Sequence, residues 1–239
     1  MTKIAFVAAL EQEVKPLVRR WRVSVLEHEG RGYKFYEDEH AVLVCGGMGA
    51  ESARRATEAI INFYSPAAVW SVGFAGALDS SMKVGEGFRP SRVVDAGDGS
   101  VIETGGREGT LVSYGAVASA EQKRKLATAY GARAVDMEAA AVARGAQARG
   151  LAFGVYKAIS DESGFDMPAL EGFIRDGRFH ELAFVSYAVI RPWLWVKVMQ
   201  LARNSSRAAQ TLCRWLVQYN AEAESLESKP PELHPMKRA

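Results

Sequence analysis

Apolar segments typical of β-strands alternate along this chain with segments that have the apolar spacing of helices. The first apolar run, Lys3–Ala9, precedes a helical pattern over Glu11–Arg20, and Ala41–Cys45 precedes a helical segment over Glu51–Tyr64. The remaining expected strands are 33–36, 67–72, 88–96, 110–113, 132–135 and 152–159, and the remaining expected helices are 120–129 and 138–148. This alternation predicts βαβ units, and therefore an α/β fold with a mainly parallel twisted central sheet flanked by helices.

The last third of the chain has a different pattern. Residues 1–222 are expected to form one domain with a C-terminal helical extension, and residues 165–203 are an apolar, aromatic-rich insertion within it. Asn204 or Ser205 can cap a final amphipathic helix. Residues 223–239 are polar and contain several prolines, so we expect a disordered tail there.

Composition and charge exclude several classes of protein. The 239 residues are 48% hydrophobic and 24% charged, which is ordinary for a globular domain. A net charge of +2 predicts no nucleic-acid partner. Two cysteines without a CxxC pair and four scattered histidines predict neither a disulfide framework nor a metal site, as in a reducing cytoplasm.

No segment is expected to cross a membrane or to be removed as a leader. The N-terminal apolar run is followed at once by Glu11 and Glu13, without a small-residue cleavage site. The stretch 182–201 contains Arg191 and Lys197, and each such residue at mid-membrane costs about 2.5–3.5 kcal/mol on insertion scales.

Acidic and glycine residues follow the ends of several predicted strands. Glu13, Gly73–Gly76, Glu138 and Asp161 each lie just after such an end. In open α/β sheets, ligands bind outside the carboxyl ends of the strands, so these residues are candidates for one pocket. Two of these carboxylates also have a common structural use, Glu138 as an acid at a helix N-terminus and Asp161 as a cap.

Segments 8–13, 72–78, 134–140 and 157–161 together resemble the nucleoside phosphorylase superfamily. Within it, the sequence is most similar to the methylthioadenosine/S-adenosylhomocysteine nucleosidases, from about residue 3 to Asp161 and again in the final helix. The resemblance implies an enzyme that cleaves the N-glycosidic bond of a purine nucleoside, a 5′-modified adenosine, and releases adenine. It also implies a homo-oligomer that needs no cofactor.

The resemblance assigns a role to each carboxylate. Breaking the C1′–N9 bond passes through an oxocarbenium-like sugar, and the purine leaves poorly unless it is protonated. Asp161 matches the aspartate that shares a proton with N7, Glu138 the glutamate that binds the ribose 2′-hydroxyl, and Glu13 the carboxylate that orients the attacking water. The other substrate-binding residues that we expect on this basis are Met137, Ser160, Phe74, Gly73, Val117 and Asp136.

The attacking group is expected near the glycine turn 46–49. This turn lacks the G-x-G-x-x-G spacing of a dinucleotide site, so we interpret it as a tight turn whose backbone at Gly47 and Gly49 faces water or phosphate. Phosphorylases of the superfamily place an arginine where this chain has Ser71, and a serine or threonine where it has Phe74. Water is therefore favoured, with phosphate as an alternative co-substrate that Arg54 could bind instead.

The insertion leaves three interpretations open. Its aromatic residues can enlarge the core, form a subunit interface, or make residues 179–203 an apolar lid or lipid-contacting surface for a large 5′ substituent. The last interpretation fits the hopanoid-associated phosphorylases, which the sequence also resembles and which would act on adenosyl-hopane. A non-catalytic nucleoside-binding relative is the alternative of another class, and the three intact carboxylates favour the enzyme.

Overall fold

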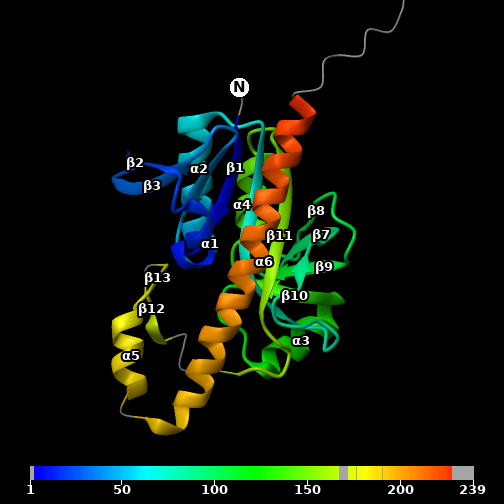
Figure 1. The fold of residues 1–239 in the computed structure, drawn as a ribbon. Coiled ribbons are helices and arrows are strands. Elements are labelled where there is room, and N and C mark those ends of the chain that lie inside the picture. Colours follow the sequence, from blue (N-terminus) through cyan, green and yellow to red (C-terminus); the bar gives the residue numbers. More distant parts are fainter. Residues whose placement is uncertain (1–2, 167–171, 176, 190, 228–239) are drawn as a thin grey trace, which may run out of the picture.

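The computed structural model describes residues 3–166, 172–175, 177–189 and 191–227, and a mixed sheet with helices on both faces forms its centre (Figure 1). The strands are β1 Ile4–Ala8, β2 Arg22–His28, β3 Arg31–Glu37, β4 Ala41–Cys45, β5 Ala68–Ala77, β6 Gly87–Phe88, β7 Arg92–Asp95, β8 Val101–Glu103, β9 Thr110–Ser113, β10 Ala132–Asp136, β11 Ala152–Asp161, β12 Ile174–Arg175 and β13 Arg178–Phe179. The helices are α1 Glu11–Val18, α2 Ala50–Tyr64, α3 Ala120–Tyr130, α4 Ala139–Gln147, α5 Glu181–Val189 and α6 Trp195–Glu227, with a short 3-10 helix, η2, at Pro192–Leu194. This architecture confirms the expected α/β fold.

Parallel pairing is concentrated in the middle of the sheet. The strand order is β2-β3-β4-β1-β5-β10-β9-β7-β8, and β11 also pairs with β5. β1 runs parallel to β4 and β5, and β11 runs parallel to β5. The hairpins β2–β3 and β7–β8 are antiparallel, as is the contact between β10 and β5. The sheet is thus mixed rather than mainly parallel. Short hairpin connections produce the antiparallel pairs at its edges, and β10 also runs opposite to its neighbour β5 in the middle.

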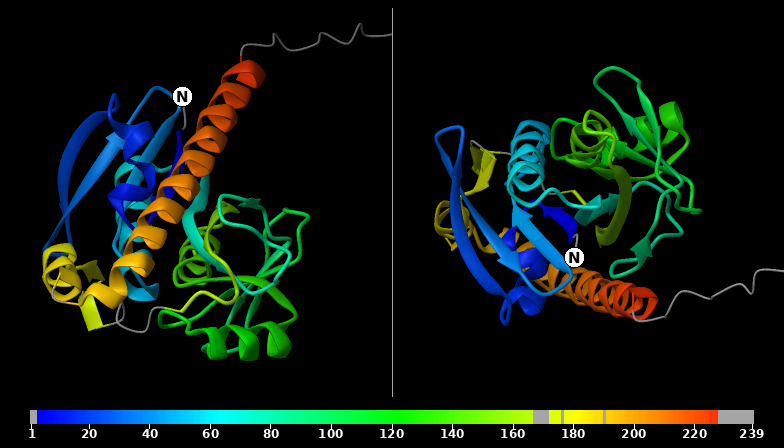
Figure 2. Two further views of the ribbon diagram at one scale, coloured as in Figure 1. Left: turned by 60° about the horizontal axis from the view of Figure 1, so that its bottom comes forward. Right: turned by 90° about the horizontal axis from the view of Figure 1, so that it is seen from above.

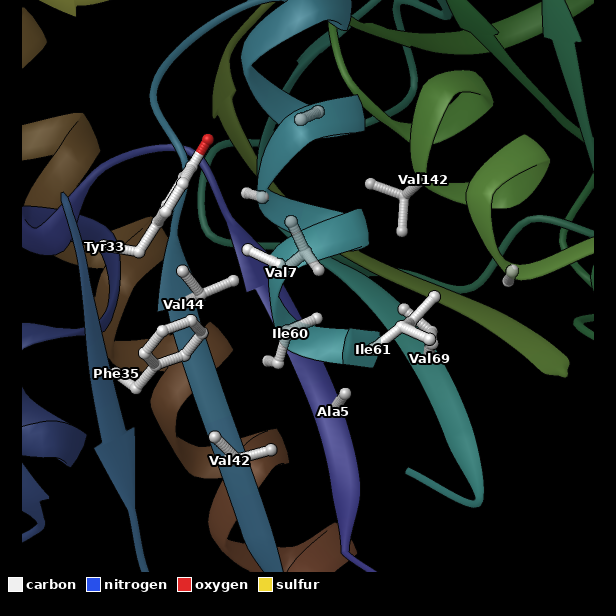
Figure 3. Packing of buried hydrophobic residues seen from close by; sticks show 14 of the residues in the cluster. Ala5, Val7, Tyr33, Phe35, Val42, Val44, Ile60, Ile61, Val69 and Val142 are labelled. Carbon is white, nitrogen blue, oxygen red and sulfur yellow. The ribbon is translucent and has the colours of Figure 1, made fainter. Parts of the chain in front are cut away.

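The side chains of β1 alternate between the two faces of the sheet, and all except the partly buried Ile4 are buried. Ala5 and Val7 pack in a cluster with residues of α2 and α4, which Figure 3 shows from close by. Phe6 and Ala8 pack on the other face with residues of α1 and α6. Successive residues of a strand point to opposite faces, so a strand covered on both sides is apolar throughout. The first apolar run of the sequence has this pattern because helices cover both faces.

One long helix, α6, crosses the second face of the sheet (Figure 2). Ala208, Leu212 and Leu216 have an exposed fraction of 0%, and their spacing of four places them on one side of the helix. Trp215 stacks on Tyr156 of β11, with ring centroids 4.2 Å apart. These contacts anchor the final helix against the strand that ends at Asp161.

Two expectations about the C-terminal region differ from the structure. The final helix does not begin at Asn204 or Ser205, because α6 runs without a break from Trp195, and Asn204 is buried within it. The polar segment expected to be disordered from residue 223 is still helical as far as Glu227. Residues 228–239, the rest of the expected tail, lie outside the described residues.

Three differences from the expected strands occur in the N-terminal half as well. β2 was not expected, because it is an edge strand whose Val23 and Val25 are exposed and which therefore lacks a buried face. β5 continues past residue 72 through the glycines at 73 and 76. The run expected over 88–96 is divided into β6 and β7.

The insertion forms the hairpin β12–β13, then α5 and η2, before it enters α6 (Figure 1). Phe184 is buried and packs edge-on against Phe173, so part of the insertion enlarges the core. Five large apolar residues further along are more than half exposed. This apolar surface consists of Val189, Trp193, Trp195, Val196 and Met199. No helix among the described residues is long and apolar enough to span a bilayer.

Candidate active site

The three carboxylates singled out in the sequence line one cavity. Its volume is about 220 Å³, and it lies where β1, β10 and β11 end. Glu13, Glu138 and Asp161 all contribute to its wall although they come from distant parts of the chain. Of the other residues expected at the site, the cavity is lined by Phe74, Val117, Asp136, Met137 and Ser160.

Glu13 is held at the start of α1. Its Oε2 accepts hydrogen bonds from the backbone N–H groups of Ala9 and Leu10, each at 3.2 Å. Leu10 is the N-cap of α1, so this carboxylate satisfies donors that the first turn of a helix leaves without partners. Glu13 therefore has a structural role at the helix N-terminus, and these contacts fix its side chain beside the cavity.

Glu138 is the residue at which the chain turns from β10 into α4. Its Oε1 accepts a hydrogen bond from the backbone N–H of Gly49 at 2.7 Å, and Oε2 accepts one from Met137 at 3.2 Å. The first contact joins the glycine turn after β4 to the carboxylate, and the φ of +89° at Gly49 is one that favours glycine. The turn thus positions Glu138.

A buried lysine lies beneath these two glutamates. Lys157 of β11 is 1% exposed, and its Nζ is 2.9 Å from Oδ2 of Asp136 and 3.1 Å from Oγ of Ser71. Asp136 also accepts hydrogen bonds from Ser113 at 2.6 Å and from the backbone N–H of Ala139 at 2.9 Å. Three donors of the protein thus hold the Asp136 carboxylate in place at the cavity wall.

Burial and mutual repulsion determine the protonation of this region. Removal from water, followed by repulsion from Glu138, raises the pKa of Glu13 to about 7 against the attraction of Lys157. Burial and the charge of Asp136 raise the pKa of Glu138. Burial alone would lower the pKa of Lys157, but the carboxylates of Asp136, Glu138 and Glu13 outweigh it and raise that pKa. The region holds more carboxylates than cations, so it binds protons readily near neutrality.

Asp161 ends β11 and has different partners. Its Oδ1 accepts a hydrogen bond from the Ser160 hydroxyl at 2.7 Å. Its Oδ2 is ion-paired with the ammonium of Lys123, a residue of α3 that is buried at the cavity wall. Both oxygens of this carboxylate are therefore held in place.

Two glycines of β5 allow the carboxylates to approach the strand. A Cβ at Gly73, where φ is +143°, would lie 2.9 Å from Oε2 of Glu13. A Cβ at Gly76 would lie 2.9 Å from Oδ2 of Asp161. Real Cβ contacts are longer, so any side chain at these positions would displace a carboxylate. Gly73 itself does not line the cavity, and its role is to make room for Glu13.

Arg54 does not lie at the cavity where the attacking group is expected to bind. Its guanidinium lies on an exposed face of α2, 2.8 Å from Glu51 and 2.7 Å from Glu58. It does not line the cavity, and neither do Gly47 and Gly49. The expectation that Arg54 could supply a cation at the site is therefore wrong, because helix geometry pairs it with its own i−3 and i+4 neighbours.

Two site residues escaped the sequence analysis although each had a signal. Lys157 interrupts an otherwise apolar strand, where a charge is rarely buried without a partner. Lys123 shares a helix face with Leu126, which is also buried. In both cases the charged residue occupies a position that the apolar pattern assigns to the interior.

The sequence profile of the phosphorylase superfamily matches residues 3–115 and 106–179. The chain belongs to the phosphorylase superfamily. A 5′-methylthioadenosine/S-adenosylhomocysteine nucleosidase of Staphylococcus aureus is 26% identical over 66% of this chain and 86% of that protein. A nucleosidase of the same name from Staphylococcus carnosus is 32% identical, over 35% of this chain and 38% of that protein.

Solved structures of the superfamily share the fold. A variant of the Helicobacter pylori nucleosidase with 5′-methylthioadenosine in its active site superposes with a TM-score of 0.70 at 20% identity, covering 93% of this chain and 99% of that chain. The futalosine hydrolase of Helicobacter pylori gives a TM-score of 0.70 at 20% identity, over 92% of this chain and 98% of that one. This superfamily member has the expected fold and is an enzyme, so the non-catalytic alternative is not supported.

Proposed function

We propose that this enzyme hydrolyses the N-glycosidic bond of a purine nucleoside, a 5′-modified adenosine, and releases adenine. One observation carries the proposal: a buried Glu13 with a pKa raised to about 7 shares a cavity with Glu138 and Asp161. A general base works best when its pKa is close to the working pH. Relatives that are named as nucleosidases at 26% and 32% identity support the same bond as the target.

In the proposed reaction, each of the three carboxylates has a different role. Asp161 faces N7 of the base, where a proton must arrive for the purine to leave. Glu138 accepts the ribose 2′-hydroxyl and offsets the positive charge that develops on the sugar, while Met137 packs against the ribose. Glu13 orients a water toward C1′ and takes its proton.

Charge at the cavity supports water over phosphate as the attacking group. Within the described part of the chain, no arginine lines the cavity. Lys157 is already paired with Asp136, and Lys123 with Asp161. A phosphate dianion beside Glu13 would therefore meet negative charge without a cation to offset it. The two structural relatives described above are named as a nucleosidase and a hydrolase, which agrees with this choice.

We also propose that the 5′ substituent is apolar. Met48, Phe74 and Leu201 line the cavity, and on α6 Leu201 closely follows Met199 of the exposed apolar surface. A substituent that leaves the cavity along α6 would thus meet exposed tryptophan, valine and methionine. The size of this group ranges from methylthio to a lipid such as the hopane of adenosyl-hopane. Alternatively, a lipid surface or a second copy of the chain covers the same residues.

Release of adenine tests the proposal directly. The enzyme is incubated with 5′-methylthioadenosine, adenosine and a long-chain 5′-alkylthioadenosine, with and without phosphate. We expect adenine and a free reducing sugar at the same rate in both buffers, and faster release as the alkyl chain lengthens. Release that requires phosphate, with a sugar phosphate as product, would show that the enzyme is a phosphorylase.

Asp161→Asn is the companion variant. Because the amide cannot transfer a proton to N7, we expect adenine release to fall by about 10²–10⁴-fold. Arg54→Ala is the matched control, since its exposed guanidinium lies away from the cavity, and its rate should equal that of the wild type. Unchanged turnover in the Asp161 variant would contradict the assigned role.

A further inference from the structure

Lys123 is a buried ammonium with every donor in use. Its side chain is 3% exposed, and it is ion-paired with Oδ2 of Asp161. Its Nζ also donates to the backbone carbonyl oxygens of Glu162 at 2.9 Å and of Phe165 at 3.4 Å. An ammonium has three N–H donors, and here three acceptors meet them. Lys123 therefore has no donor left for a substrate and can act on one only through Asp161.

Local features of α3 and of β5 both position the Lys123–Asp161 pair. On α3, Ser119 and Gln122 form a reciprocal capping box, and Lys123 follows in the first turn that this box fixes. On β5, a Cβ at Gly76 would lie 3.3 Å from Cε of Lys123 as well as 2.9 Å from Asp161. Two independent local features thus bring the ammonium and the carboxylate together.

These contacts limit what Asp161 can do alone. Its Oδ1 accepts from Ser160 and its Oδ2 from Lys123. Each oxygen of this carboxylate thus already has a donor from the protein, and the donor at Oδ2 is an ammonium. The leaving purine needs a proton at N7, and a charged donor in contact with Asp161 is placed to supply it through that carboxylate. The Lys123 ammonium is such a group.

We propose that Lys123 is a positioning residue that supplies, through Asp161, the proton taken up at N7; this inference rests on the proposed function. As the C1′–N9 bond breaks, its electron pair passes to the purine ring. N7 takes a proton from Asp161, which takes one from the Lys123 ammonium. Water adds to C1′ and its proton goes to Glu13. Neutral adenine leaves, and solvent later removes the proton from Glu13 and returns one to Lys123.

Two substitutions separate proton supply from charge and packing. Lys123→Met keeps the length of the side chain but has no proton, whereas Lys123→Arg keeps the charge on a group that does not give up its proton. Both variants should lose adenine release from 5′-methylthioadenosine by about 10²–10⁴-fold, mainly in kcat. The matched control is Lys125→Met on the exposed face of the same helix, where the rate should not change.

A substrate with a better leaving group provides the second readout. The p-nitrophenyl riboside releases a stable phenolate that needs no proton, so its loss in Lys123→Met should be about 10-fold or less. Combining Lys123→Met with Asp161→Asn should cost no more than Asp161→Asn alone, because both act on one proton path. Unfolding curves of each variant check that the fold persists.

Three results would overturn the inference. They are wild-type adenine release in Lys123→Met, full rescue by Lys123→Arg, and losses that add in the double variant. Wild-type enzyme that releases no base from any nucleoside overturns the proposed function, and this inference with it. A wild type that is active beside an equally active Lys123→Met overturns the role of Lys123 alone.

Discussion

Two buried lysines serve the cavity in different ways. Lys157 lies among Asp136, Glu138 and Glu13, and its cation is shared between several carboxylates. Lys123 faces a single carboxylate, Asp161, together with two carbonyl oxygens. The first region has an excess of negative charge, and the second is a balanced pair.

In the reaction proposed above, this difference separates the two proton transfers. Burial, followed by repulsion from Glu138, raises the pKa of Glu13 to about 7, which suits a group that is proposed to accept a proton from water. At the other end of the cavity, one ammonium meets one carboxylate, and we propose that this pair supplies the proton to the base. The proposed acceptor and the proposed donor thus lie in surroundings of different charge balance.

Removing Lys157 should have the largest effect on stability. In Lys157→Met the Asp136 carboxylate stays buried beside Glu138 without its cation, and breaking such a pair costs about 3–5 kcal/mol. We expect this loss in the free energy of unfolding, measured by urea titration. Lys34→Met is the control, since the exposed Lys34–Glu11 pair contributes at most about 1 kcal/mol. Equal losses in the two variants would remove the distinction between the buried and exposed pairs.

Glu13→Gln should change how stability depends on pH. The pKa of Glu13 is about 7 in the folded protein against a usual value of 4.5, so between these values the folded state binds more protons than the unfolded one. Stability from this group is therefore present at low pH and is lost as pH rises to about 7. From about pH 4 to about pH 8, the variant should gain about 2–3 kcal/mol relative to the wild type. The free energy of unfolding measured across this range tests the expectation.

A neighbouring glutamate provides the control for this pH effect. The neighbouring Tyr36 hydroxyl and the Lys34 ammonium lower the pKa of Glu11, on the same helix, so Glu11→Gln should respond to pH in the opposite direction. In the wild type, adenine release should also increase through about pH 7 as Glu13 loses its proton. A flat difference between Glu13→Gln and the wild type would mean that Glu13 has an ordinary pKa.

Alanine substitution of the two glycines of β5 should have the smallest effects on stability. The two variants should also distinguish the region around Glu13 from the region around Asp161. Gly73→Ala combines a close approach to Glu13 with a φ of +143°, so we expect a stability loss of about 1–3 kcal/mol. Gly76→Ala meets only the ends of the Asp161 and Lys123 side chains, so its cost should be about 1 kcal/mol with a larger loss of turnover.

Unfolding and turnover of both glycine variants are compared with Gly32→Ala, where the nearest atom to the new Cβ is 4.0 Å away. That control should resemble the wild type. If Gly73→Ala and Gly76→Ala lose stability equally, the positive φ at Gly73 has no measurable cost.

Much of the fold could be predicted from the apolar pattern. The segment over β9 was expected with its observed bounds, and α2 begins only one residue before the expected helix. Edge strand β2 was missed because a strand with no buried face has little apolar signal. The break expected at Asn204 was wrong because tertiary packing carries α6 through a residue that is common at helix caps.

The sequence by itself determined the order of elements and the three carboxylates, since apolar periodicity and residue type are local properties. Tertiary structure alone decided which charged and polar side chains meet. Lys123 and Asp161 are 38 positions apart, and Lys157 and Ser71 are 86 apart, so no local pattern relates them. Charge interactions depend on distances of a few ångströms in space. For the same reason, the sequence allowed Arg54 to be a phosphate ligand, whereas in the fold it forms surface ion pairs with Glu51 and Glu58.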